Sequence, residues 1–270
     1  MEGWLMGSYK NSLSISDAGV KRIAEHEGTI DGLYNDPSKY CTYGVGHLVR
    51  KSECFMLAGA NSDEQLKKSI QKQWPGKSYE TTYVPRTIVT SENFAKIKEA
   101  ATRNAQEYFA QRQHKKSFVN LASADQERIK THAEAAIKEE TDLLPFVATD
   151  QFKKDLQSYE TTVNSGVTGV ALTQGMFDAL VSFVYNVGKG AFNSSQLLKK
   201  INENIFMSGD DMKKREEAIK EIEEEFLKWN KSGGSVLKGL TTRRQDEADR
   251  FLSQARQSLE TLKMTQNLKK

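Results

Sequence analysis

The spacing of apolar residues along the chain predicts a mostly helical fold. Val20, Ile23, Ala24 and Glu27 fall at i, i+3, i+4 and i+7 behind Ser16, a residue type that caps helix N-termini. Gly28 then ends this first predicted helix. Similar apolar stripes predict further helices over residues 91–116, 123–140, 149–163, 194–202 and 212–230, and a last one from Thr241 or Thr242.

One predicted helix differs from the others because it has no polar face. Residues 176–187 are almost entirely apolar, Thr173 stands at the position of an N-cap, and Asn186 and Gly188 mark the end. A helix that is apolar all round is buried. This segment is therefore expected to be the central helix of the core, with the loop 188–195 after it.

A short β element follows the first helix. Residues 33–36 and 40–43 read as two strands joined by the turn Asp36-Pro37-Ser38-Lys39. Gly44 and Gly46 lack side chains, which allows a helix or a sugar to approach the backbone closely. The fold class expected is α+β and mostly helical, with a small β-hairpin lobe.

The middle of the chain has a less regular pattern of apolar residues. Residues 48–90 are broken by prolines and glycine and read as irregular with short helices. Ser123 and Gln126 have the spacing of a capping box at the start of the helix 123–140, which Leu144 and Pro145 end.

Composition limits the classes of protein that fit. The chain has 270 residues, of which 37% are apolar, enough to bury a core, and its net charge of +3 is too diffuse to indicate nucleic-acid binding. No apolar run approaches a membrane span, and the N-terminus lacks the pattern of a Sec-type signal peptide. Cys41 and Cys54 form no ligand cluster, so we expect two free thiols and no metal site, with a disulfide between them as the alternative in an oxidising compartment.

Two carboxyl groups near the N-terminus have the environments of an acid and a base. Glu27 lies on the apolar face of its helix, and a carboxyl group half-buried against a core resists ionisation and can donate a proton near neutral pH. Asp36 lies in a polar turn and should remain ionised, and the turn folds Thr42 back toward it. Such a pair is typical of glycoside hydrolysis.

The spacing of these residues resembles a known family. The intervals between Glu27, Asp36, Thr42 and His47, in the motifs EG, LYND and TYGVGH, resemble those of the phage-type lysozymes of glycoside hydrolase family 24. Two further blocks resemble the same family, namely LTQGMFDALVSFVYNVGKGAFNSSQLLKKIN and the set FLKWN, GG, GL and RRQDEADRF. The resemblance covers residues 15–50 and about 149–256.

The resemblance implies a lysozyme-like fold and a role for each matching residue. Glu27 would protonate the glycosidic oxygen, Asp36 would activate the attacking water, and Thr42 would help to hold that water. The positions at which family members contact the sugar chain are occupied by Leu48, Tyr185 and Ser195. Two more residues would support the site, His47 and Asn186. The implied activity is that of an inverting muramidase without metal or cofactor, acting on peptidoglycan glycan strands. Pro37, Lys39 and Cys41 depart from the family pattern in the turn.

The resemblance also implies a domain organisation. A catalytic domain would comprise residues 15–50 and 146–256, with an N-terminal extension at 1–14, a helical insertion at 51–145 and a tail at 257–270. The insertion would either pack beside the hairpin lobe or present a surface for an inhibitor protein or a secretion carrier. Made in the cytoplasm without a Sec-type signal, the enzyme would reach the wall through a holin or a secretion machine. The alternative is a wall-binding or spike-type interaction protein that has lost turnover.

Overall fold

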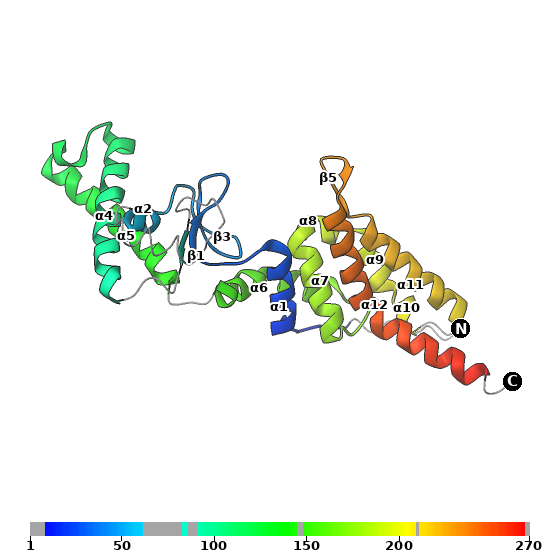
Figure 1. The fold of residues 1–270 in the computed structure, drawn as a ribbon. Helices are drawn as coiled ribbons and strands as arrows, with labels where there is room; N and C mark the ends of the chain where they lie inside the picture. Colours follow the sequence, from blue (N-terminus) through cyan, green and yellow to red (C-terminus); the bar gives the residue numbers. More distant parts are fainter. Residues whose placement is uncertain (1–8, 62–82, 86–90, 145–147, 209–210, 268–270) are drawn as a thin grey trace. The chain divides into compact units, whose positions relative to one another are not determined.

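The computed structural model describes residues 9–61, 83–85, 91–144, 148–208 and 211–267. The chain divides into two compact units (Figure 1). The first, termed here the hairpin unit, comprises Glu27–Lys154, and the second, termed the helical unit, comprises Met1–His26 and Asp155–Lys270.

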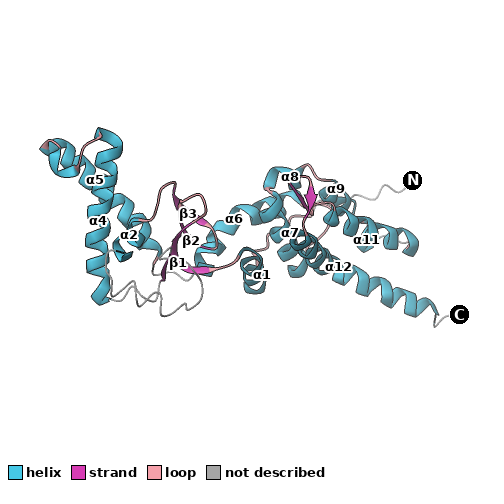
Figure 2. Ribbon diagram, turned by 45° about the horizontal axis from the view of Figure 1, so that its top comes forward, coloured by secondary structure: helices cyan, strands magenta, loops and turns pink. Residues whose placement is uncertain are grey.

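The hairpin unit combines a small antiparallel sheet with helices (Figure 2). The sheet has the strand order β3-β2-β1-β4. Its strands are β1 (Ile30–Asn35), β2 (Cys41–Gly44), β3 (His47–Arg50) and β4 (Tyr83–Pro85). The other elements are α2 (Phe55–Asn61), α4 (Ser91–His114), the 3-10 helix η2 (Phe118–Asn120), α5 (Ser123–Leu143) and the start of α6 (Ala148–Gly166).

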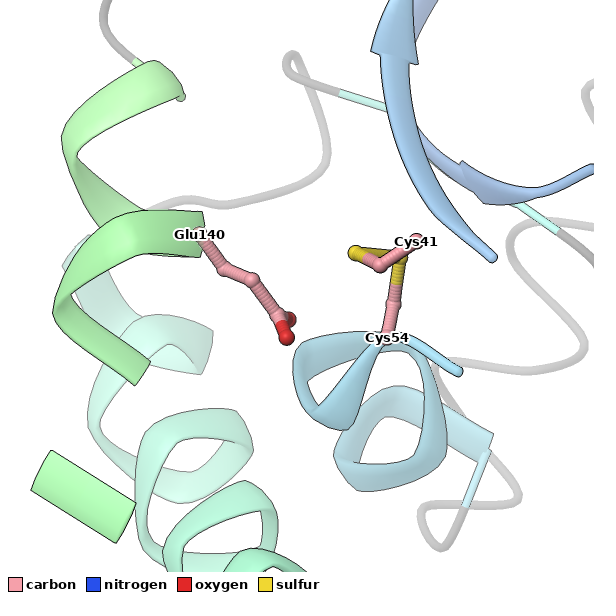
Figure 3. A group of neighbouring side chains, drawn as sticks. All are labelled: Cys41, Cys54 and Glu140. Carbon is pink, nitrogen blue, oxygen red and sulfur yellow. A yellow bond between two sulfur atoms is a disulfide. The ribbon is translucent and has the colours of Figure 1, made fainter. Parts of the chain in front are cut away.

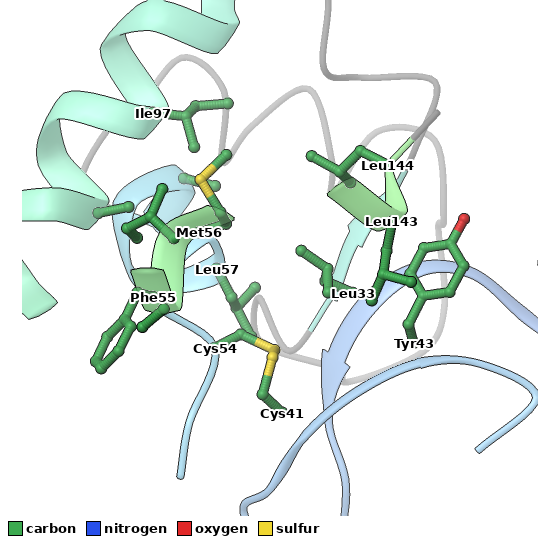
Figure 4. Close-up of a cluster of buried hydrophobic side chains, with 14 of the residues drawn as sticks. Leu33, Cys41, Tyr43, Cys54, Phe55, Met56, Leu57, Ile97, Leu143 and Leu144 are labelled. Carbon is green, nitrogen blue, oxygen red and sulfur yellow. A yellow bond between two sulfur atoms is a disulfide. The ribbon is translucent and has the colours of Figure 1, made fainter. Parts of the chain in front are cut away.

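The core of the hairpin unit joins one face of the sheet to α2, α4 and α5 (Figure 4). Leu33 and Tyr43 come from the sheet, and Met56 and Ile97 from the helices, and all four are almost completely buried. The apolar stripe predicted for residues 94–109 belongs to this core, since Ile97, Ala101 and Ala105 are buried and Phe94 and Phe109 pack against it. The chain itself therefore covers this stripe.

The helical unit is organised around α7 (Gln174–Val187). Residues 176–184 are all buried, and the Thr173 hydroxyl accepts a hydrogen bond from the Met176 amide, which confirms both the buried helix and its N-cap. Phe183 packs edge-to-face against Phe226 and Trp229. The surrounding elements are α1 (Asp17–Glu27), α8 (Lys189–Asn193), α9 (Gln196–Glu203), α10 (Ile205–Ser208), α11 (Met212–Leu227), the hairpin of β5 (Lys231–Ser232) and β6 (Ser235–Val236), and α12 (Lys238–Asn267).

Several local predictions were wrong. The capping box fails, because Ala122 is the N-cap of α5 and the Gln126 side-chain amide instead donates to the Phe118 carbonyl. The loop after α7 contains the short helix α8, and α12 begins at Lys238, before the two threonines. Strands β3 to β6 were not predicted. Most of the stretch 48–90 and Pro145 lie outside the described residues.

No helix among the described residues is both long enough and apolar enough to cross a bilayer.

Candidate active site

The helix that ends at Glu27 is capped at one end and stopped at the other. The Ser16 hydroxyl accepts from the Gly19 amide at 3.0 Å, as an N-cap does. Gly28 follows with φ at +79°, a left-handed conformation that glycine adopts without strain and that ends the helix. The Glu27 side chain is exposed, so the expectation of a carboxyl group half-buried against the core is wrong.

The start of α1 is fixed to α7 by a buried carboxylate. Asp178 accepts hydrogen bonds from the Ser16 amide, at 3.0 Å, and from the Ser16 hydroxyl. Gly19 makes this contact possible, since a Cβ there would lie 2.8 Å from the Asp178 Cγ. Farther along α1, Arg22 pairs with Asp246 of α12 at 2.8 Å. These contacts set the direction in which α1 runs toward Glu27.

Asp36 lies in the turn between β1 and β2 and is partly buried. Its amide donates to the Tyr40 carbonyl at 3.0 Å, and its Oδ1 accepts from the Tyr40 amide at 2.8 Å. Because this second bond fixes the rotation of the carboxylate, the turn delivers an oriented acceptor rather than a free surface acid.

Thr42 and Leu48 lie on the same face of the sheet. Residues that pair directly across antiparallel strands share a face, and Thr42 pairs with Leu48 on β3 and with Tyr34 on β1. Thr42 is buried and its hydroxyl donates to the Tyr40 carbonyl at 3.1 Å, whereas Leu48 is 47% exposed. With its proton engaged, the Thr42 oxygen presents lone pairs that accept hydrogen bonds.

Tyr34 is a candidate site residue that the sequence interpretation missed. Burial raises the pKa of its hydroxyl, the Gly46 amide donates a hydrogen bond to it, and the nearby Asp36 charge raises the pKa further. The Tyr34 hydroxyl is thus within the electrostatic influence of Asp36, and Tyr34 shares the face that carries Thr42. The hairpin register contained this signal, because any residue directly opposite Thr42 must share its face.

His47 has a structural environment. It pairs with Tyr43, so it lies on the face of the sheet opposite Thr42, and its Nδ1 lies 3.4 Å from the Gln151 amide nitrogen of α6. Gly44 permits this approach of α6, as a Cβ at Gly44 would come within 3.1 Å of the Ala148 Cβ. The close approach expected at this glycine is therefore made by a helix.

The remaining three predicted residues belong to the helical unit. Tyr185 is partly buried and packs edge-to-face on Tyr159, with ring centroids 5.2 Å apart. Asn186 is exposed near the end of α7. The Ser195 hydroxyl caps α9, accepting from the Leu198 amide and donating to the Phe192 carbonyl. The predicted sugar contacts of Tyr185 and Ser195 and the supporting role of Asn186 remain predictions.

The cysteines are not free. Cys41 and Cys54 form a disulfide, contrary to the expectation of two thiols. Figure 3 shows the buried Glu140 carboxylate pointing toward the same region. Although the three side chains offer ligand atoms within 4.8 Å of one another, the thiolate is the metal-binding form of cysteine, and here both sulfurs are bonded to each other.

Comparison with known proteins finds a family match in the second half of the chain. Residues 130–247 match the family model described as phage lysozyme. This segment, which makes up less than half of the chain, is therefore similar to the phage lysozyme family. The matched segment contains α6 to α11 and most of the two later blocks of the sequence, whereas residues 27–47 precede it.

Two phage endolysins and one solved structure are similar to this chain. The chain is 43% identical over 106 residues to an endolysin of Bacillus phage PZA, covering 39% of this chain and 36% of the relative, and 43% identical over 101 residues to an endolysin of Bacillus phage B103, covering 37% and 33%. It thus spans about a third of the length of these relatives. A solved structure of a P22 lysozyme mutant is similar with a TM-score of 0.44 and 20% identity, covering 89% of this chain and 99% of that one.

Proposed function

We propose that this chain is a muramidase, which hydrolyses the β-1,4 bond between N-acetylmuramic acid and N-acetylglucosamine in peptidoglycan. The observation that carries the proposal is the phage lysozyme segment at 130–247, in a chain that also holds Glu27, Asp36 and Thr42 around a short hairpin. Most glycoside hydrolases act through a pair of Asp or Glu side chains, and Glu27 and Asp36 are the pair proposed for this chain.

In this mechanism Glu27 is the general acid. Its position at the last residue of α1 leaves the carboxyl group exposed, where it can reach a glycosidic oxygen. Protonation of that oxygen lets the leaving sugar depart as an alcohol, while positive charge develops on the other sugar ring.

Asp36 is the general base and acts on a water molecule. Its Oδ1 is held by the Tyr40 amide, and the remaining lone pairs of the carboxylate can accept a proton from the water. The Thr42 oxygen accepts a second hydrogen bond from that water, since its own proton goes to the Tyr40 carbonyl. Attack from the face opposite the leaving group inverts the anomeric carbon.

The test compares conservative variants in a zymogram and in turnover of soluble glycan fragments. Glu27→Gln and Asp36→Asn should each reduce kcat by about 10² to 10⁴, because loss of one general acid or base costs that much. Asp36→Asn retains an oxygen for the Tyr40 amide, so the turn keeps its shape. Thr42→Ala should lose about tenfold, the scale of one hydrogen bond.

Glu25→Gln is the matched control, since Glu25 lies on the same helix, is exposed and pairs only loosely with Lys21 at 4.0 Å. It should keep full activity. Turnover by folded Glu27→Gln at the wild-type rate would rule out the assignment. Wild-type protein that binds walls without cleaving them would instead support a wall-binding protein. Proton NMR should show the α-anomer first if the reaction inverts.

Action at the cell wall follows from this substrate, and two delivery routes fit. One is release through a holin during phage lysis, and the endolysin relatives named above come from phages. The other is export by a secretion machine, in which case a carrier or an inhibitor protein would bind the enzyme. Expression with and without a holin, followed by lysis measurements, separates the two.

A further inference from the structure

The turn that carries Asp36 is held at both of its ends by a single residue. Asn35 and Cys41 face each other at the base of the turn, as the last register pair of β1 and β2. The Asn35 Oδ1 accepts a hydrogen bond from the Cys54 amide at 2.8 Å, and Cys41 is joined to Cys54 by the disulfide. Both sides of the Asp36 turn are therefore attached to Cys54.

The position of Cys54 is in turn fixed by contacts at the start of α2. It directly precedes α2, whose first two amides, those of Phe55 and Met56, donate to the Glu140 carboxylate at 2.9 and 2.7 Å. Figure 3 shows Glu140 projecting from α5 toward this helix start. Glu140 is fully buried and also pairs with Arg50, so the start of α2 is fixed to α5 and β3.

A chain of short contacts thus runs from the core to the Asp36 carboxylate. It passes from Glu140 to the start of α2, from Cys54 to Asn35 and Cys41, and from the base of the turn to the Tyr40 amide that orients Asp36. Cys41 adds one more contact, donating its amide to the Ser52 carbonyl at 2.7 Å. Asn35 and Cys41 do not face the same side of the sheet as Thr42, because they alternate with Tyr34 and Thr42 along their strands.

We propose that Asn35 and the Cys41–Cys54 disulfide are positioning elements for Asp36, and that the chain reaches full turnover only when this disulfide is formed. The proposal rests on the proposed role of Asp36 as the base. Reduction by a dithiol such as dithiothreitol transfers two electrons and two protons. The S–S bond breaks, each cysteine becomes a thiol, and the reductant closes its own disulfide.

The expected effect falls on the chemical step. Release of one side of the turn displaces the carboxylate relative to the water it activates, and misplacement of about 1 Å can cost a factor of about 10². Binding of the glycan is not expected to change, since neither cysteine nor Asn35 lies on the Thr42 face. The reduced chain should therefore show a kcat lowered by at least about tenfold with KM within about twofold.

Three variants test the two attachments separately, using the full chain and soluble glycan fragments. Cys41→Ala/Cys54→Ala should lower kcat as reduction of the wild type does, and should be insensitive to dithiothreitol. Asn35→Leu, in which the disulfide remains, should lower kcat because the Cys54 amide loses its acceptor. Asn35→Asp keeps an acceptor oxygen and should retain most of the activity. A loss of kcat in Asn35→Leu but not in Asn35→Asp would show that the lost acceptor, and not general destabilisation, is the cause.

Hydrogen exchange of the Tyr40 amide provides a readout that does not depend on activity. This amide donates to Asp36, so its exchange should accelerate in the double cysteine variant and in Asn35→Leu. The Phe177 amide, bonded to the Thr173 carbonyl in α7, is the internal control and should not change.

The outcomes are distinct. The positioning proposal is overturned if the double cysteine variant is folded and keeps both the wild-type kcat and the wild-type exchange rate of the Tyr40 amide. If the double variant does not fold, the same two measurements on Asn35→Leu decide the question. If wild-type protein cleaves no glycan but Tyr40 exchange responds as expected, the attachment of the turn stands and the proposed function fails.

Discussion

Each unit buries a glutamate beside arginine, but the two carboxylates bind different kinds of group. Glu140 in the hairpin unit accepts from two backbone amides of α2 and pairs with Arg50, so it joins three elements. Glu247 in the helical unit accepts from the Ser182 hydroxyl of α7 at 2.6 Å and pairs with Arg243 and Arg244 of its own helix. One carboxylate caps a helix, whereas the other neutralises buried charge.

This difference determines which buried groups lose their partner when each carboxylate is removed. Arg244 is completely buried and lies over the Phe183 ring at 4.9 Å, so it has no route to solvent without disrupting the core. Arg50 is better protected against such a loss, because its Nη1 also lies 3.5 Å from the exposed Glu139. The helical unit should therefore depend more on its glutamate than the hairpin unit does.

The largest effect is expected for Glu247→Ala. Removing one partner of a buried ion pair leaves an uncompensated charge and costs about 3–5 kcal/mol of unfolding free energy. The measurement is urea unfolding, followed by hydrogen exchange in α7 and α12 so that the loss can be located. Glu224→Ala on the exposed face of α11 is the control and should change stability by less than about 0.5 kcal/mol.

Glu140→Ala should cost less, about 2–3 kcal/mol. Two amides at the start of α2 lose their acceptor, each at the lower end of the range of about 1–3 kcal/mol for an unsatisfied buried group, while Arg50 retains Glu139. Glu139→Ala is the matched control on the neighbouring position of α5. Exchange of the Phe55 and Met56 amides should accelerate only in Glu140→Ala. A loss of stability equal to or larger than that of Glu247→Ala would contradict the comparison.

The two glutamates also predict a pH dependence. Burial raises the pKa of Glu140 and of Glu247 above the ordinary value of 4.5, and the neighbouring arginines oppose this only in part. Between the unfolded and folded pKa values the native state binds more protons than the unfolded chain, so stability falls as the pH rises through that interval. Each glutamate thus favours folding more at mildly acidic pH than at neutral pH.

The check compares the unfolding free energy at about pH 5 and about pH 7 for wild type and for Glu140→Gln. The variant lacks the titrating group and should show a smaller decline toward neutral pH. Glu139→Gln, exposed beside it, should follow the wild type. An identical slope in Glu140→Gln would mean that Glu140 stays ionised throughout this range.

How much the sequence could predict differs between the units for physical reasons. Residues 176–184 were predicted because an apolar surface all round leaves a helix no alternative to burial. The disulfide was missed because cysteines 13 residues apart carry no signal of proximity until β2 and α2 are placed.

The error at Glu27 has a different origin. Periodicity put it on the apolar face of α1, but burial in this helix ends at Ala24, and periodicity cannot show where a core ends. Tyr34, by contrast, was predictable from the hairpin register alone, since a residue opposite Thr42 must share its face. The site was thus better specified by strand pairing than by helix periodicity.

The smallest effect concerns Lys39, where the sequence departs from the family pattern. Lys39 has φ at +60°, a left-handed conformation that costs an L-residue about 1–2 kcal/mol and glycine almost nothing. Its exposed ion pair with Glu53 at 3.9 Å offsets little of this cost. Lys39→Gly should therefore stabilise the hairpin unit by about 0.5–1 kcal/mol, after allowing for the greater freedom of glycine in the unfolded chain.

The matched control for Lys39→Gly is Lys115→Gly, because Lys115 follows α4 with φ at +55° and lies far along the chain from the Asp36 turn. Thermal unfolding should shift upward by a few degrees in both variants. Only Lys39→Gly should also alter kcat, because residue 39 lies in the turn that carries Asp36, where its backbone amide donates to the Asp36 carbonyl at 2.8 Å, and glycine gives that turn more conformational freedom. A stabilised Lys115→Gly beside a destabilised Lys39→Gly would show that the lysine side chain, rather than the backbone, determines the shape of this turn.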